Sequence, residues 1–238
     1  MPSSPRPKPW APLRHLLIDA DDTLWENNIY FERATEEFID FLDHSTLDRD
    51  EIRAVLDEFE RVNAREHGYG SKVYTRSLEA CYRNLSERDI DEEQLELVLR
   101  FGLRILEQEM ELIPHVETTL AHLSRRYLLT LCTKGDPEEQ QIKIDRSGLV
   151  HFFHQVEIMA EKDIAAYERI LDHLGAAPNE ACMIGNSPRS DINPPLELGM
   201  WAVFIPHDHT WQLEHQEIDL SHDRLLVIER FADLVDYL

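Results

Sequence analysis

The chain has 238 residues, of which 42% are hydrophobic, and this length allows one large domain or a core domain with a smaller one. Aspartate and glutamate (47 residues) outnumber lysine and arginine (24 residues), which gives a formal net charge of −23. A surface this acidic repels nucleic acid and anionic lipid, so we expect neither nucleic acid nor a membrane as a partner.

The start of the chain and its cysteines bear on the cellular compartment. Residues 1–12 are rich in proline and have no apolar stretch, so we expect a flexible arm rather than a secretory signal. The apolar runs elsewhere are far too short for a membrane-spanning helix. Cys81, Cys132 and Cys182 are widely spaced in apolar surroundings, which predicts buried free thiols in a reduced, cytoplasmic protein.

The first predicted element is a buried strand that ends at Ile18 and is followed by Asp19 and Asp21. In extended backbone both aspartates project from one face. Carboxylates crowded at a strand end repel one another unless a cation or a shared proton intervenes. The pattern therefore indicates a carboxylate nucleophile, a second carboxyl as acid or base, and a divalent metal. The alternative is an exposed acidic turn that caps the helix after it.

Residues 27–113 have the spacing of amphipathic helices, because apolar side chains recur every three or four positions. The stripes cover residues 31–42, 52–62, 74–85 and 95–106. Four helices in succession without a strand predict a helical bundle that is inserted after the first strand. Between the second and third helices, two glycines flank Tyr69 and precede Lys72. This stretch is either a loop that sets substrate specificity or a plain glycine turn.

After Pro114, short apolar runs alternate with helical stretches. The expected strands are Tyr127–Cys132, Gln155–Met159, Ala181–Ile184, Trp201–Ile205 and Arg224–Ile228, and the expected helices are Val116–Arg126, Pro137–Arg146, Asp163–Leu174, Pro194–Leu198 and Phe231–Leu238. This alternation predicts an α/β fold with a Rossmann-like parallel sheet, to which the first strand also belongs. We expect the core domain to comprise residues 13–26 and 114–238, and the helical insertion residues 27–113.

Polar side chains follow the predicted strands at the edge where a parallel sheet binds its ligands. Thr133 and Lys134 follow the second strand, Lys162 follows the third, and Asn186 and Asp191 follow the fourth. Together with the two aspartates after the first strand, these residue types suit a phosphate group and a metal ion. The sequence therefore predicts a site at this edge of the sheet.

The segment Asp19-x-Asp21-x-Thr23-Leu24 resembles the first motif of the haloacid dehalogenase-like (HAD) hydrolases, most of which are phosphatases. The later polar clusters appear in the order of the other three HAD motifs, and the resemblance covers nearly the whole chain. It implies a HAD fold of subfamily I, in which the helical insertion is a C1 cap. It also implies a Mg²⁺-dependent phosphatase that hydrolyses a small phosphorylated metabolite through an aspartyl phosphate.

The resemblance also implies roles for individual side chains. Asp19 would be the nucleophile, and Asp21 would protonate the leaving alkoxide and then activate water. Thr133 would hold the transferring phosphoryl oxygens, and Lys162 would offset the charge that builds on them. Lys134 would either present a second cation to the phosphate or be a solvated lysine without a role.

The remaining substrate contacts implied by the resemblance come from the cap. Caps of this family send the loop that contains Tyr69 and Lys72 towards the nucleophile, so both are candidate contacts for the leaving group. Cap closure would exclude water while the aspartyl phosphate forms.

The fourth motif departs from the family pattern. Mg²⁺ would be held by Asp19, Asp21, Asn186 and Asp191, but the family usually has aspartate where this chain has Asn186. Asparagine ligates Mg²⁺ without charge, so metal binding is expected to be weaker.

Two alternatives to the phosphatase therefore stay open. The first is a 2-haloacid dehalogenase, although these enzymes lack the acid equivalent to Asp21. The second is a catalytically weak binding or regulatory protein with the same fold. His207, His209 and His215 match no zinc motif, so we predict no zinc site there.

Overall fold

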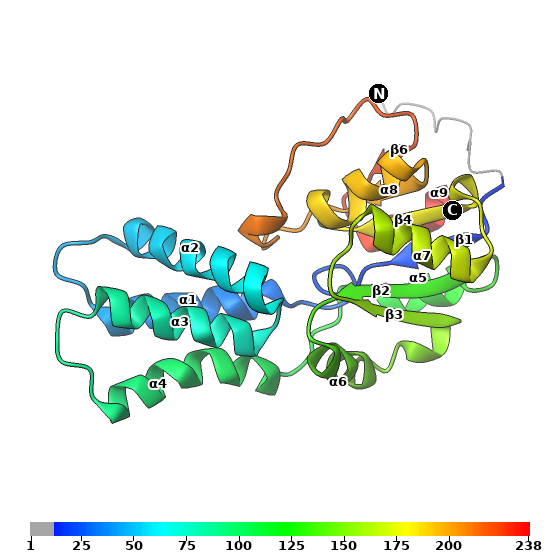
Figure 1. The fold of residues 1–238 in the computed structure, drawn as a ribbon. Coiled ribbons are helices and arrows are strands. Elements are labelled where there is room, and N and C mark those ends of the chain that lie inside the picture. The colour runs from blue at the N-terminus through cyan, green and yellow to red at the C-terminus, as the bar shows by residue number, and fades with distance from the viewer. Residues whose placement is uncertain (1–11) are drawn as a thin grey trace, which may run out of the picture.

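The computed structural model describes residues 12–238, and it contains a six-stranded parallel sheet with the strand order β3-β2-β1-β4-β5-β6 (Figure 1). The strands are β1 (His15–Ile18), β2 (Leu128–Lys134), β3 (Gln155–Met159), β4 (Ala181–Gly185), β5 (Trp201–Phe204) and β6 (Leu225–Val227). The predicted Rossmann-like sheet is therefore confirmed. The predicted flexible arm falls almost wholly on residues 1–11, which lie outside the described residues.

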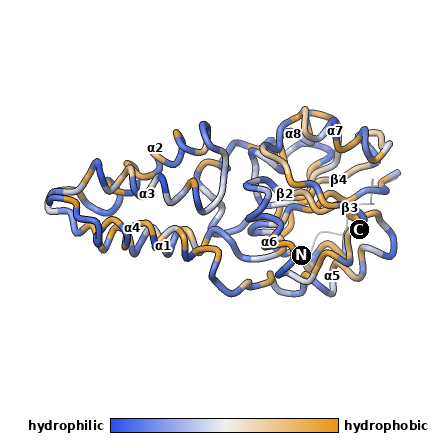
Figure 2. Tube along the Cα trace, turned by 60° about the horizontal axis from the view of Figure 1, so that its bottom comes forward, coloured by the Kyte–Doolittle hydropathy of each residue, from blue (hydrophilic) through white to orange (hydrophobic). Residues whose placement is uncertain are grey.

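Helices cover both faces of the sheet, because side chains of each strand alternate between the two faces. Leu16 and Ile18 point to the face covered by α5 (Val116–Leu123), α6 (Pro137–Ser147) and α9 (Leu234–Tyr237). Leu17 points to the opposite face, where it packs with α7 (Ile164–Leu174). The short helix α8 (Asn193–Leu198) covers β5 on that face. Figure 2 shows hydrophobic residues gathered in the strands, as expected for a sheet buried on both sides.

Four helices lie between β1 and α5 in the sequence and form a layer beside the sheet (Figure 1). They are α1 (Asn28–Leu42), α2 (Arg49–His67), α3 (Ser71–Leu85) and α4 (Glu92–Leu103). Each contributes a fully buried side chain to a separate hydrophobic core, namely Phe38, Leu56, Leu78 and Val98. The predicted helical bundle is thus confirmed.

The helix starts follow from local sequence. Asp48 caps α2 by accepting a hydrogen bond from the backbone N–H of Glu51, and the Glu51 side chain accepts one from the Asp48 N–H in return. The Asp136 side chain caps α6 by accepting hydrogen bonds from the backbone N–H groups of Glu138 and Glu139, and the missing N–H of Pro137 costs nothing at the first helical position. Such side chains satisfy the backbone donors that a helix start leaves unpaired.

Some element boundaries differ from the sequence prediction. β2 continues to Lys134, so Thr133 and Lys134 lie in the last part of the strand rather than after it. The C-terminal helix is shorter than expected, since a 3₁₀ turn at Phe231–Asp233 precedes α9. Within residues 12–238 all three cysteines are buried and free, as predicted, and no helix is long and apolar enough to span a membrane.

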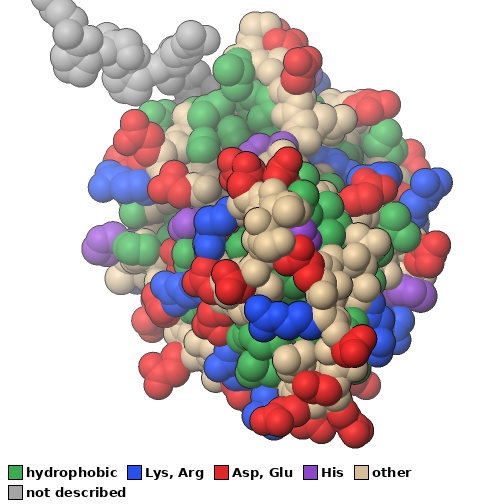
Figure 3. Space-filling model, turned by 90° about the vertical axis from the view of Figure 1, so that its left-hand side faces the viewer, with side chains coloured by type: hydrophobic (Ala, Val, Ile, Leu, Met, Phe, Trp, Pro, Cys, Tyr) green, Lys and Arg blue, Asp and Glu red, His purple; other side chains and the backbone are tan. Residues whose placement is uncertain are grey.

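The surface carries the charge that the composition indicates. Figure 3 shows the end of the molecule formed by the helical layer, where acidic side chains are scattered among basic and hydrophobic ones. Exposed ion pairs on these helices, such as Arg49 with Glu36, offset part of the repulsion and contribute little to stability individually.

Candidate active site

A cavity between the helical layer and the edge of the sheet contains most of the residues that the sequence singled out. It is lined by side chains of both layers and holds about 1050 Å³ of space, including the part open to solvent. Asp19 directly follows β1, which lies between β2 and β4. The strands β2 and β3 extend the sheet on one side of β1, and β4, β5 and β6 extend it on the other side. Ligands of open parallel sheets bind at such a crossover, outside the carboxyl ends of the strands.

Asp19 is buried, with only 6% of its surface exposed. Its Oδ1 lies 2.5 Å from Nζ of Lys162, and its Oδ2 accepts a hydrogen bond of 2.9 Å from the Thr23 hydroxyl. Burial and the nearby Asp191 carboxylate raise the pKa of Asp19 to about 7, against the opposing effect of Lys162. The fold therefore holds a carboxylate where ionisation is unfavourable unless a cation is added.

Lys162 connects the aspartate that follows β1 with the aspartate in the loop after β4. Its ammonium donates to Asp19 and, at 2.7 Å, to Oδ1 of Asp191. Burial lowers the pKa of Lys162, but the attraction of the two carboxylates is stronger and raises the pKa above its ordinary value. Two carboxylates share one ammonium, so this cluster has one negative charge in excess when both carboxyl groups are ionised.

Oxygen atoms that could hold a divalent cation converge beside this cluster. Oδ2 of Asp19 and Oδ1 of Asn186 lie 2.9 Å and 3.3 Å from the same hydroxyl oxygen, that of Thr23. The Asn186 amide nitrogen donates to the Thr210 hydroxyl at 3.1 Å, which orients the amide oxygen towards Asp19. Carboxylate and amide oxygens are the donors that Mg²⁺ takes from proteins, so the residues present fit such an ion.

Asp21 faces the cavity from a turn that returns to Trp25. Its carboxylate accepts hydrogen bonds from the Trp25 indole at 2.7 Å and from the Gln140 amide at 2.9 Å. Nζ of Lys143 lies 2.5 Å and 2.7 Å from its two oxygens. Gln140 and Lys143 lie one turn apart on α6, and the sequence analysis did not identify either of them. The sequence signal that could have found them is their spacing of three residues, which places both on one face of the helix after β2.

Thr133 and Lys134 lie beside these groups, but each already has a partner. The Thr133 hydroxyl donates to Oε1 of Gln140 at 3.0 Å, so it must rotate before it can donate to a phosphoryl oxygen. Nζ of Lys134 lies 2.5 Å from Oε1 of Glu214 and 3.3 Å from Glu161. Lys134 is thus an ion-paired lysine rather than a free cation.

Glu214 is another site residue that the sequence analysis missed. It belongs to a 3₁₀ turn at Gln212–Glu214, after the last predicted motif, and the hydroxyls of Ser187 and Ser190 also donate to it. Burial alone would raise its pKa, but Lys134 and the two hydroxyls lower the pKa of Glu214 to about 2. This carboxylate therefore links the β2 end to the loop after β4.

A family model, described as haloacid dehalogenase-like hydrolase, matches residues 13–194 of the chain. The chain belongs to this hydrolase family. A solved haloacid dehalogenase-like hydrolase from Xanthomonas campestris superposes with a TM-score of 0.79 at 28% identity, covering 93% of this chain and 92% of that one. The resemblance inferred from the motifs is thereby confirmed.

Two curated relatives of this HAD hydrolase are named phosphatases. A phosphoserine phosphatase from Thermus thermophilus is 36% identical over 100 residues, which are 40% of each chain. A glyceraldehyde 3-phosphate phosphatase from Methanothermobacter thermautotrophicus is 29% identical over 131 residues, which are 52% of this chain and 58% of that one. The match thus spans about half the length of these relatives.

The helical layer of this HAD hydrolase contributes Tyr69 to the cavity. The Tyr69 hydroxyl donates to Glu161 at 2.6 Å, and Nζ of Lys134 lies 4.4 Å from the centre of the tyrosine ring. Lys72 differs from the expectation, because its side chain is exposed, ion-paired with Glu138 at 3.5 Å, and absent from the cavity lining. The first turn of α3 directs Lys72 outward, while Ser71 beside it is buried.

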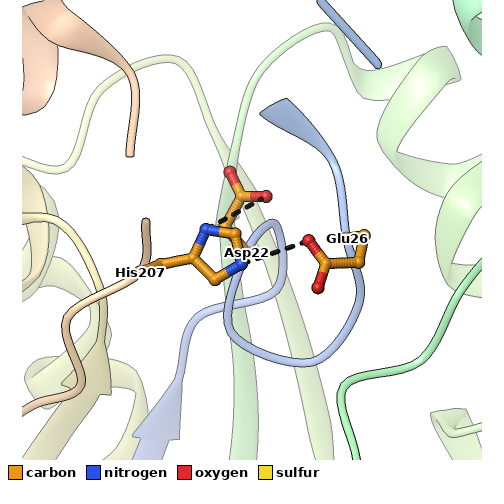
Figure 4. Close-up of side chains that lie close together, drawn as sticks. All are labelled: Asp22, Glu26 and His207. Carbon is orange, nitrogen blue, oxygen red and sulfur yellow. Dashed lines mark ion pairs between the residues drawn. The ribbon is translucent and has the colours of Figure 1, made fainter. Parts of the chain in front are cut away.

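A second group of polar side chains lies where the chain passes from β1 to α1 (Figure 4). Nε2 of His207 lies 3.1 Å from Glu26, and its Nδ1 lies 3.9 Å from Asp22. Within residues 12–238 these three are the one trio of His, Cys, Asp or Glu ligand atoms close enough to share a metal ion. Asp22 already accepts hydrogen bonds from the backbone N–H groups of Asn27 and Asn28, which indicates that it anchors the start of α1. His209 and His215 are not part of this trio.

Proposed function

We propose that this HAD hydrolase is a Mg²⁺-dependent phosphatase that acts on a small phosphorylated metabolite through an aspartyl phosphate on Asp19. The observation that carries the proposal is the pair of aspartates in one cavity with different partners. Asp19 is paired with Lys162, and Asp21 is paired with Lys143 from another element. Because the two carboxylates have different partners, one can attack the substrate while the other transfers protons. The named activities of the curated relatives agree with a phosphatase.

The chemical steps follow from these positions. Asp19 attacks phosphorus, and the bond from phosphorus to the ester oxygen breaks. In its protonated form Asp21 donates its proton to the leaving oxygen, and its carboxylate then removes a proton from the water that hydrolyses the aspartyl phosphate. Lys162 stays beside Asp19 and stabilises the charge that develops on the phosphoryl oxygens.

We propose that Mg²⁺ binds to Asp19, Asn186, Asp191 and the backbone carbonyl of Asp21. When bound, it would neutralise charge on the phosphoryl group. Asp191 contacts Lys162 and the Ser187 N–H in the structure, so its share in metal binding depends on loosening one of these contacts. We also propose that residues 27–113 serve as the cap, and that residues 13–26 and 114–238 form the catalytic core.

Asp21 favours attack on phosphorus over attack on carbon. A halide ion leaves without a proton, whereas an alkoxide requires one, so a dehalogenase has no use for a second acid at this position. The geometry at Asp21 therefore supports the phosphatase over the 2-haloacid dehalogenase.

The test is hydrolysis of p-nitrophenyl phosphate with and without Mg²⁺, alongside halide release from 2-chloropropionate. We expect phosphate release that needs Mg²⁺ and is lost in Asp19→Asn, whereas Asp40→Asn on the exposed face of α1 retains it. Halide release without phosphate release would establish the dehalogenase. Absence of both reactions across a panel of phosphorylated metabolites would favour a binding or regulatory protein.

A further inference from the structure

Glu60, a carboxylate of the helical layer, points into the cavity with little compensation for its charge. It lies on α2, lines the cavity, and is 7% exposed. Its Oε2 accepts a hydrogen bond of 2.9 Å from the Trp211 indole. Its Oε1 has no hydrogen-bond donor among residues 12–238, and no lysine or arginine among them forms an ion pair with it. Arg53, the nearby cation, is held by Glu32 and Asp57.

The other carboxylates that line the cavity have stronger compensation. Each has either a lysine within 4 Å or at least two hydrogen-bond donors: Asp19 and Asp191 have Lys162, Asp21 has Lys143, Glu214 has Lys134, Asp22 has two backbone N–H groups, and Glu139 has Ser71 and Lys72. A buried charge without a partner is strongly unfavourable. Burial raises the pKa of Glu60 to about 7 against the opposing effects of Arg53 and Trp211, as burial also raises the pKa values of Asp19 and Asp22; what sets Glu60 apart, within the part of the chain that the structure describes, is the missing partner of its Oε1.

The lining of the cavity into which Glu60 points suits a cation better than a neutral polar group. Phe31, Tyr69, Tyr74 and Trp211 line the same cavity, and aromatic faces attract ammonium groups. The cavity lining also has seven carboxylates but only three lysines, and each of these lysines is already ion-paired. An ammonium group remote from the phosphate would offset part of this excess locally, at Glu60.

We propose that Glu60 binds a primary ammonium group on the alcohol part of the substrate, so that the preferred substrates are phosphate monoesters of amino alcohols or amino sugars. The proposal rests on the phosphatase function, since the phosphate must lie at Asp19 for the alcohol part to extend towards α2. Glu60 is then a specificity-determining residue. The free Oε1 accepts a hydrogen bond from the ammonium group, while Trp211 holds the other oxygen.

Matched pairs of esters that differ in the amino group test the proposal. One pair is 2-aminoethyl phosphate and ethyl phosphate, and the other is glucosamine 6-phosphate and glucose 6-phosphate. A hydrogen bond between charged groups predicts that kcat/KM for the amino ester of at least one pair is about 10- to 100-fold higher. Glu60→Gln, which keeps the shape and an acceptor for Trp211, should reduce this ratio to near one.

Glu58→Gln is the matched control, because Glu58 lies on the same helix but is exposed and paired with Arg61. It should leave the ratio unchanged. Thermal melting of Glu60→Gln shows whether the variant folds, and Glu60→Asp provides a second variant that keeps the charge and shifts it by one methylene. A ratio near one in the wild type, or a high ratio that survives in Glu60→Gln, would overturn the assignment.

Calorimetric binding to Asp19→Asn separates this inference from the phosphatase function. The amino ester should bind about 10- to 100-fold more tightly than its neutral partner, and the difference should vanish in the Asp19→Asn, Glu60→Gln double variant. If the wild type hydrolyses no phosphate ester but this difference is present, the phosphatase function fails and the ammonium site stands. If hydrolysis occurs and esters of plain polyols show the Glu60-dependent gain instead, Glu60 binds hydroxyl groups and the ammonium assignment fails.

Discussion

Replacing Glu139 with alanine should weaken the contact between the helical layer and the sheet at the start of α3. Glu139 lies on α6, yet its buried carboxylate accepts hydrogen bonds from the N–H and hydroxyl of Ser71 at 2.8 Å and 2.9 Å and from the N–H of Lys72 at 3.3 Å. It therefore caps the N-terminus of α3 from across the cavity. A negative charge at this position is also favoured by the helix dipole.

The magnitude follows from the contacts that are lost. A hydrogen bond to an ionised group contributes about 1.5–3 kcal/mol, but water can replace part of three such bonds at the cavity edge. We therefore expect the opening of the α3 N-terminus to become about 2 kcal/mol easier. By the factor of ten per 1.4 kcal/mol, this corresponds to roughly 30-fold faster hydrogen exchange.

The assay is hydrogen exchange at the backbone amides of Ser71 and Lys72, with Glu138→Ala as the matched control. Glu138 precedes Glu139 on α6, but its side chain is 85% exposed and forms an ion pair with Lys72 at 3.5 Å. Its removal should change the free energy of opening at the start of α3 by less than about 0.5 kcal/mol. Equal exchange in the two variants, or unchanged protection in Glu139→Ala, would refute the idea that Glu139 holds the two layers together.

Three further predictions concern the charged groups of the site. Asp19→Asn should lower turnover by more than about a thousand-fold, because the amide is a poor nucleophile; it should also stabilise the fold above pH 7. The folded-state pKa of Asp19 is raised to about 7, so the wild type loses stability as the pH rises from about 4 to 7. Urea unfolding should therefore show a larger advantage of the variant at about pH 8 than at about pH 5. Asn186→Asp should tighten Mg²⁺ binding by adding a charged ligand, and a calorimetric titration with unchanged affinity would show that residue 186 does not bind the metal. Lys143→Met should slow the hydrolysis of esters with poor alkoxide leaving groups by about ten-fold or more, because Lys143 positions Asp21. Hydrolysis of p-nitrophenyl phosphate should be affected less, since nitrophenolate needs little protonation. Equal losses on both ester types would contradict this role.

Hydrophobic periodicity was sufficient to predict the parallel α/β class and the helical insertion, whereas the HAD fold was inferred from the motifs. The helical stripes and the short apolar runs depend on which side chains must be buried, and this requirement is local along the chain. The sequence also predicted that Asp19, Lys162, Asn186 and Asp191 lie close together. The carboxyl ends of parallel strands meet at one edge of the sheet, independently of the conformation of the loops. The structure brings these four side chains together, while their roles in catalysis stay predictions.

Only the tertiary structure decided which partner each charged side chain has. The rotation of α6 turns Lys143 towards Asp21, and the path of the loop after β5 brings Glu214 to Lys134. The first turn of α3 directs Lys72 away from the cavity, against the sequence expectation. These outcomes depend on helix rotation and loop path, which are set by packing between segments that lie far apart in the chain. The positions of strands and helices along the chain follow from local patterns of burial, whereas the order of the strands and the pairing of charges are decided where separate elements meet.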